Sequence, residues 1–149
     1  MPTSGVLAYR ATYALFVLAL PLYIWYRWTY TVAWDADVSE KGFSFRNGMA
    51  LLPVEEDKSK LWKEVVREQK VTQRSRQIGF ENHTTTDDHL MHIVGLAQDQ
   101  NGEEYFVIKN SWGQDNPYGG RQYISMAYFD AKTIAVTMHQ GALKSKKRK

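Results

Sequence analysis

Residues 88–113 read DHLMHIVGLAQDQNGEEYFVIKNSWG and contain the clearest structural pattern in the chain. Two runs rich in β-branched and aromatic residues, 90–97 and 104–111, flank the pair Asn101-Gly102. Asn-Gly between two such runs is the strongest short-range signal for a hairpin. The sequence therefore predicts an antiparallel β-hairpin over this stretch.

The segments around the hairpin predict a mixed α+β fold with an antiparallel sheet. Periodicity and turn residues give the following elements: a strand at 31–34, a polar loop at 35–42, a helix or pair of helices at 57–80, a loop at 82–88, and strands at 121–125 and 133–139. A chain of 149 residues that is 44% hydrophobic can bury one ordinary core. We therefore expect one compact domain at 31–143.

The charge is concentrated at the C-terminus. The formal net charge is +3, but residues 144–149 hold five of the 19 cations, so the rest of the chain carries 14 cations against 16 anions. A uniformly basic surface for specific nucleic-acid binding is therefore excluded. A run of like charges repels itself, so we expect a disordered basic tail with at most weak, salt-sensitive affinity for polyanions.

The chain contains no cysteine. This excludes disulfides, thiolate zinc sites, iron–sulfur ligation and a cysteine nucleophile within this sequence. A metal site built from Asp87, Asp88, His89 and His92 is also disfavoured. His89 and His92 point to opposite faces of one strand, whereas ligands must converge on one ion. The sequence therefore implies no metal and no cofactor.

The N-terminal part, residues 1–30, is an apolar leader. Ala11–Tyr26 is a run of 16 uncharged residues between Arg10 and Arg27. A membrane-spanning helix needs roughly 20 apolar residues, so this run is a borderline candidate. An export signal, a membrane anchor, and a buried or artefactual leader all remain open.

Strand alternation places His89, Met91 and Ile93 on one face of the first hairpin strand. A two-residue turn at Asn101-Gly102 would put Asn110 opposite Ile93 on that face, about 13 Å along the strand from His89. Direct pairing of His89 with Asn110 would need a wider loop or a bulge between residues 98 and 103. On the residues alone, His89 is an ordinary surface or core histidine.

Three motifs change that interpretation. The segment KNSWG at 109–113 follows a strand, HLM at 89–91 opens another strand after Asp88, and VAWDADVSEKGF occupies 32–43. Together they resemble the papain-like cysteine peptidases, in particular the aminopeptidase C and bleomycin hydrolase branch. The resemblance extends over about 31–143 and implies the antiparallel sheet half of a papain-like fold.

The resemblance also implies roles for three residues. His89 would be the catalytic base, Asn110 would orient its imidazole, and Trp112 would cover their hydrogen bond. The cysteine nucleophile and the oxyanion glutamine of such enzymes lie in an N-terminal helical part. We therefore expect a C-terminal portion only, inactive by itself.

The same resemblance implies a peptide substrate for the complete enzyme, a cytoplasmic location, and, as a candidate partner, a separate chain that carries the N-terminal half. The alternative is a small non-enzymatic protein that Ala11–Tyr26 anchors at a membrane.

Overall fold

The computed structural model describes residues 32–143. The predictions of an apolar leader at 1–30 and of a disordered tail at 144–149 lie outside the described residues and stay predictions. Contacts divide the chain into a compact unit at 32–137 and a second unit, of which 138–143 is described. No helix within 32–143 is both long and apolar enough to cross a bilayer.

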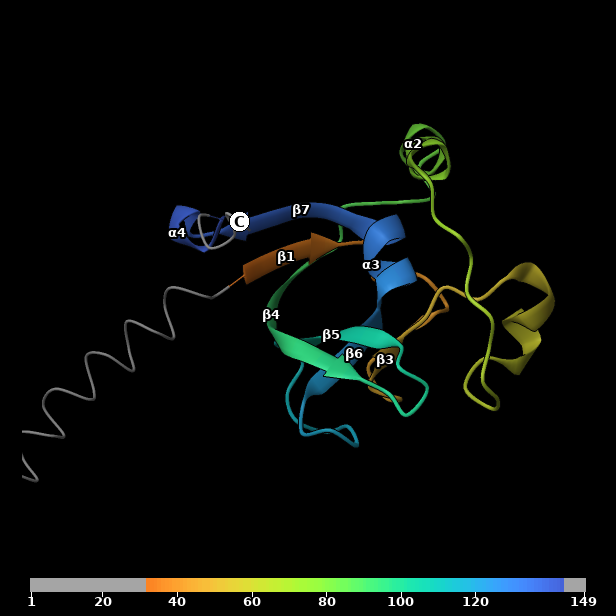
Figure 1. The fold of residues 1–149 in the computed structure, drawn as a ribbon, viewed down its shortest axis with the longest axis horizontal. Coiled ribbons are helices and arrows are strands. Elements are labelled where there is room, and N and C mark those ends of the chain that lie inside the picture. The colour runs from red at the N-terminus through yellow and green to blue at the C-terminus, as the bar shows by residue number, and fades with distance from the viewer. Residues whose placement is uncertain (1–31, 144–149) are drawn as a thin grey trace, which may run out of the picture. The chain divides into compact units, whose positions relative to one another are not determined.

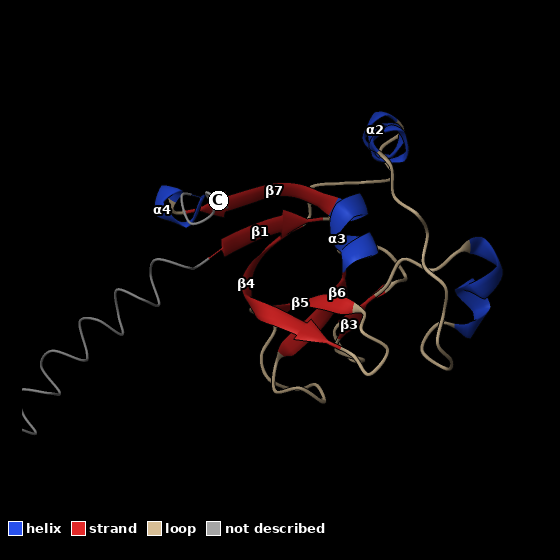
Figure 2. Ribbon diagram, in the orientation of Figure 1, coloured by secondary structure: helices blue, strands red, loops and turns tan. Residues whose placement is uncertain are grey.

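The described residues form strands and short helices, with η1 and α2 between two groups of three strands (Figure 2). The elements of residues 32–143 are β1 Val32–Ala36, β2 Phe43–Ser44, β3 Met49–Ala50, the 3-10 helix η1 Glu55–Lys60, α2 Gln73–Glu81, β4 His89–Gln98, β5 Glu104–Lys109, β6 Arg121–Ser125, α3 Met126–Lys132, β7 Thr133–Met138 and α4 Gln140–Leu143. The predicted α+β fold is confirmed, and so are its five longer strands and the loop before β4.

The strands described in residues 32–143 form one sheet in the order β2-β3-β6-β5-β4-β1-β7. The β1–β4, β4–β5 and β5–β6 pairs are antiparallel, whereas β3 runs parallel to β6. Figure 1 shows β4 curving from the β1 side of the sheet to the β5 side. The curvature brings the inward side chains of distant strands toward one another.

The core lies between the inward face of the sheet and α3. Trp34, Ile108, Ile124 and Tyr128 are fully buried there. Phe129 of α3 stacks on Trp34, with ring centroids 5.4 Å apart. Burying such aromatic and aliphatic side chains stabilises the fold by about 1.5–3 kcal/mol each. Helix α3 is therefore part of the core that supports β1, β5 and β6.

Of the predicted helix or pair of helices over 57–80, the pair is present, but it does not fill the range. The chain forms η1 and α2, but the residues between them are not helical, and Trp62 has a positive φ of 70°. The Asp57 carboxylate accepts hydrogen bonds from the backbone N–H and the guanidinium of Arg67. This contact folds the segment back on itself, and it leaves Val65 89% exposed instead of on a helical stripe.

Four elements were absent from the sequence prediction: β2, β3, α3 and the four-residue α4. Strands β2 and β3 have two residues each, which is too short for a detectable alternation. Helix α3 has seven residues and begins at Met126; the side chain of the preceding N-cap residue, Ser125, accepts from the backbone N–H of Tyr128.

The hairpin loop is wider than two residues, as predicted, because Gln98 pairs with Glu104. Asp99 closes the loop: its carboxylate accepts from the backbone N–H groups of Asn101 and Glu103. Gly102 takes a φ of 90°, which glycine adopts without strain. The bulge, however, lies between Ile93 and Gly95, outside the predicted interval.

Candidate active site

His89 and Asn110 are hydrogen-bonded across the hairpin. His89 is the first residue of β4, Asn110 directly follows β5, and His89 Nε2 lies 2.9 Å from Asn110 Oδ1. The predicted cross-strand contact is confirmed, but the predicted directly opposed register is wrong. Beyond the bulge Ile93 lies opposite Ile108, and His92 lies opposite Lys109. Continuing this register places Asn110 opposite Met91. The contact between Asn110 and His89 is therefore diagonal, two residues away from direct opposition.

The amide of Asn110 is buried and has partners at both ends. Its Oδ1 accepts from the backbone N–H of Ser111 at 2.7 Å, and its Nδ2 donates to Gln122 Oε1 at 3.0 Å. The Ser111 N–H can only donate, so it requires the oxygen of the amide on the His89 side. His89 Nε2 must then be protonated, so that its N–H donates the hydrogen bond to Asn110 Oδ1.

The other ring nitrogen of His89, Nδ1, is available to accept a proton. Within residues 32–143 no hydrogen bond is made to His89 Nδ1. In a neutral imidazole with a protonated Nε2, Nδ1 holds the lone pair and can take a proton. The arrangement is therefore that of an oriented base whose acceptor nitrogen is open.

Trp112 covers the imidazole. Its ring stacks on that of His89 with centroids 4.8 Å apart and planes inclined by 22°. Phe43 and Phe45 meet Trp112 edge to face at 5.8 and 5.7 Å. Trp112 is still 44% exposed, so it is not an ordinary core aromatic. The expected contact of Trp112 with the Asn110 side chain stays a prediction.

The chain just before His89 is fixed by Asp88. The Asp88 carboxylate accepts from the backbone N–H groups of Val38 and Ser39, both at 3.2 Å, and from the Thr86 hydroxyl at 2.7 Å. The Thr86 hydroxyl contributes most to a lowered pKa of Asp88. These bonds join the β1 end to the start of β4, where His89 lies.

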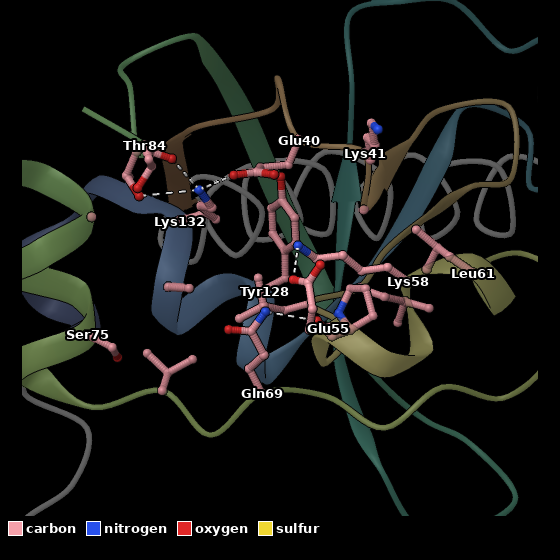
Figure 3. Close-up of a pocket in the computed structure, with 18 of the residues that line it drawn as sticks. Glu40, Lys41, Glu55, Lys58, Leu61, Gln69, Ser75, Thr84, Tyr128 and Lys132 are labelled. Carbon is pink, nitrogen blue, oxygen red and sulfur yellow. Dashed lines mark hydrogen bonds and ion pairs between the residues drawn. The ribbon is translucent and has the colours of Figure 1, made fainter. Parts of the chain in front are cut away.

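A buried ion pair supports the same region from the other side. Lys132 Nζ lies 3.1 Å from Asp37 Oδ2 and 2.6 Å from Glu40 Oε1, and it donates to the Thr84 carbonyl at 2.6 Å. Figure 3 shows Lys132 reaching both Glu40 and Thr84. The Tyr128 hydroxyl donates to the Asp37 carbonyl, and burial raises the pKa of Tyr128 well above its usual range. This polar cluster holds two loops that precede the site residues in the sequence.

A cavity of about 890 Å³ lies beside that cluster (Figure 3). The segment 51–71, α2 and α3 contribute to its walls, and the charged side chains Glu55 and Lys58 at its edge are paired with each other. His89, Asn110 and Trp112 do not line it. The cavity is thus separate from the hydrogen-bonded histidine and asparagine.

The carboxylates near His89 do not form a metal site. Desolvation, and then the neighbouring Asp87 carboxylate, raise the pKa of Asp35. His92 is exposed and lies opposite Ala33 and Lys109, on the face of β4 away from His89. No group of three or more histidine, aspartate or glutamate residues within 32–143 is placed to hold a metal ion.

The sequence profile of the papain family cysteine protease matches residues 56–142. The chain belongs to the papain family of cysteine proteases. No curated protein sequence matches the chain significantly. Membership in this family agrees with the site, where His89 and Asn110 are hydrogen-bonded. Asn110 is the first residue of the NSWG segment, which directly follows β5.

Solved structures superpose on about three quarters of this chain. PepW from Lactobacillus rhamnosis HN001 superposes with a TM-score of 0.52 at 18% identity, covering 74% of this chain and 23% of that chain. Bromelain from Ananas comosus, in complex with the E64 inhibitor, gives 0.39 at 14% identity over 73% and 41%. The proform of the ragweed pollen allergen Amb a 11 gives 0.41 at 16% over 72% and 26%. This papain-family chain therefore spans between about a quarter and two fifths of the length of those structures.

The sequence prediction missed one member of the site. Gln122 in β6 contacts the Asn110 amide, and its side chain is fully buried. The available signal was its position: Gln122 alternates with the apolar, inward Ile124 in the predicted strand. Nothing local in the sequence shows which residue such a buried amide meets.

Proposed function

We propose that this chain supplies the histidine and the asparagine of a Cys-His-Asn peptidase site, and that the cysteine comes from a part of that site outside this sequence. The observation that carries the proposal is the hydrogen bond from His89 Nε2 to Asn110 Oδ1, which leaves Nδ1 open. The substrate of the assembled site is a peptide. The chain alone does not hydrolyse peptides, because its sequence contains no cysteine.

The proposed reaction follows from this geometry. His89 Nδ1 takes the proton of the cysteine thiol, and the thiolate attacks the peptide carbonyl carbon. The imidazolium then gives that proton to the leaving amine as the C–N bond breaks, and water hydrolyses the thioester. Asn110 Oδ1 accepts a hydrogen bond from Nε2–H throughout, which fixes the ring plane without adding a negative charge that would compete with the thiolate.

The surroundings of His89 favour this role. Trp112 shields one face of the imidazole from water, and hydrogen bonds are stronger where water is excluded. Asp88 and its partners fix the backbone directly before His89. A catalytic base needs such an orientation before it needs a shifted pKa.

The finer assignment within the papain family rests on the motifs. HLM at 89–91, NSWG at 110–113 and VAWDADVSEKGF at 32–43 resemble the aminopeptidase C and bleomycin hydrolase branch. We therefore assign the assembled enzyme as a cytoplasmic thiol aminopeptidase, which removes residues from free peptide N-termini.

The test is hydrolysis of an aminoacyl reporter substrate. The purified chain is assayed alone, and then with the cysteine-bearing helical half of a papain-family protease, tethered by a Gly/Ser linker that raises the effective concentration. We expect no turnover by the chain alone and thiol-dependent turnover by the pair, abolished by His89→Ala. Turnover by the rigorously purified chain alone, or turnover by the pair that survives His89→Ala, would contradict the proposal.

A further inference from the structure

Gln122 is a polar residue at an apolar position. It is the second residue of β6, lies opposite Ile108 of β5, and its side chain is fully buried. Ile124, the next inward residue of the same strand, packs in the hydrophobic core. A leucine or methionine would fill the position with a similar volume, so the amide of Gln122 needs a reason other than packing.

The contact of Gln122 supplies that reason. Its Oε1 accepts from Asn110 Nδ2 at 3.0 Å, while Asn110 Oδ1 faces His89. A side-chain amide has nearly the same shape after a half-turn that exchanges its oxygen and its nitrogen. Only one of the two orientations presents an acceptor to His89 Nε2.

We propose that Gln122 is a positioning residue, whose carbonyl holds the Asn110 amide with its oxygen toward His89. This inference rests on the proposed function of His89 and Asn110 as a catalytic pair. The only other contact of Asn110 Nδ2 in the described part of the chain is Met91 Sδ at 3.8 Å. A thioether is a weak acceptor, so Gln122 provides the strong one.

The unused half of the Gln122 amide supports this role. Gln122 Nε2 is buried and has no hydrogen-bond partner within residues 32–143. Rotating the Gln122 amide would turn Nε2 toward Asn110 Nδ2 and place two donors face to face. The observed orientation therefore serves Asn110 while it leaves Gln122 itself incompletely bonded, which is unfavourable for stability.

Loss of this acceptor has a defined consequence for His89. An Asn110 amide that turns over presents Nδ2–H to His89 Nε2, and Nε2 must then hold the lone pair. The imidazole proton moves to Nδ1, the nitrogen that would take the thiol proton. The Ser111 N–H opposes this change, because it donates to Oδ1. Gln122 and Ser111 thus fix the tautomer together.

The test is the tautomer of His89 in the full chain, read from its ring ¹⁵N shifts by NMR at a pH where the ring is neutral. We expect Gln122→Leu to raise the ratio of the Nδ1–H form to the Nε2–H form about two- to tenfold, the range for one ordinary hydrogen bond. Gln122→Glu keeps an acceptor oxygen in either protonation state and should restore the wild-type ratio. Gln122→Met replaces the leucine variant if that variant does not fold.

Ile108→Val is the matched control. Ile108 is also fully buried and lies directly opposite Gln122, but it does not hydrogen-bond to Asn110. The control should lower stability and leave the tautomer ratio unchanged. A wild-type ratio in Gln122→Leu, or an equal change in Ile108→Val, overturns the positioning role.

The two proposals fail in different ways. The tautomer experiment needs no cysteine and no substrate. A shifted tautomer in Gln122→Leu, with no hydrolysis by the cysteine-complemented protein, keeps the positioning role and rejects the proposed function. Hydrolysis that depends on His89, with an unshifted tautomer ratio in Gln122→Leu, keeps the proposed function and rejects the positioning role.

Discussion

Replacing Lys132 by methionine removes the cation from a buried ion pair. The Lys132 and Asp37 side chains are only 7% and 1% exposed. Removing one partner of such a pair costs about 3–5 kcal/mol, because the other charge stays buried without compensation. Asp37 would keep three donors, from Ser39 N, Ser39 Oγ and Thr86 N. We therefore expect a loss near the lower limit, about 3 kcal/mol in the free energy of unfolding.

The loss is measured by urea unfolding of the full chain, followed by tryptophan fluorescence. For a folded region of this size it corresponds to a fall in Tm of about 12 °C. In a double-mutant cycle with Asp37→Asn, the coupling energy should be about 2 kcal/mol. Lys58→Met is the matched control, because Lys58 pairs with Glu55 at the surface and should leave the midpoint unchanged. Equal midpoints for Lys132→Met and Lys58→Met would refute the reasoning.

Three further predictions concern other parts of the fold. The Arg67 guanidinium lowers the pKa of Asp57 to about 2, so the stability from this contact is complete above the usual value of 3.8 and is lost as the pH falls through about 2. The protection factor of the Arg67 amide, which is its exchange rate relative to the intrinsic rate at the same pH, should fall in that window. Asp57→Asn should remove this fall, and a constant protection factor in the wild type would count against the prediction. Gly48 has a φ of 64°, and an added Cβ would meet the Tyr118 ring, so Gly48→Ala should destabilise by at least about 1 kcal/mol in urea unfolding. Gly95→Ala, where a Cβ meets nothing within 4 Å, should be close to neutral, and equal effects would reject the steric argument. Trp112→Ala should speed exchange of the His89 Nε2 proton with water by NMR, because the stacked ring is lost; an unchanged rate would show that Trp112 does not shield it.

The hairpin could be predicted because it depends on local patterns, whereas the contact between His89 and Asn110 was expected only from the resemblance to the papain-like peptidases. Strand alternation fixes which side chains share a face, and this parity held at the site. The register could not be predicted, because Asp99 closes a wider loop than Asn-Gly alone favours and a bulge after Ile93 shifts the ladder. Two small irregularities together converted the expected 13 Å separation into a diagonal hydrogen bond.

The absence of a helix between η1 and α2 and the unpredicted role of Gln122 have one cause. Val65 and its apolar neighbours repeat at helical spacing, but the contact between Asp57 and Arg67 decides the path of that segment. Gln122 is likewise defined by Asn110 on a neighbouring strand. Interactions between residues that are distant in sequence override local periodicity, and no local pattern reports them.

The central claim is that His89 meets a cysteine and holds its proton. The most direct measurement is the rate at which iodoacetamide alkylates the cysteine of the tethered helical half at about pH 6, where an unassisted thiol is almost fully protonated. We expect the cysteine to be alkylated at least about tenfold faster with the wild-type chain than with His89→Ala, because an imidazolium partner stabilises the thiolate. Equal alkylation rates for the two chains would contradict it.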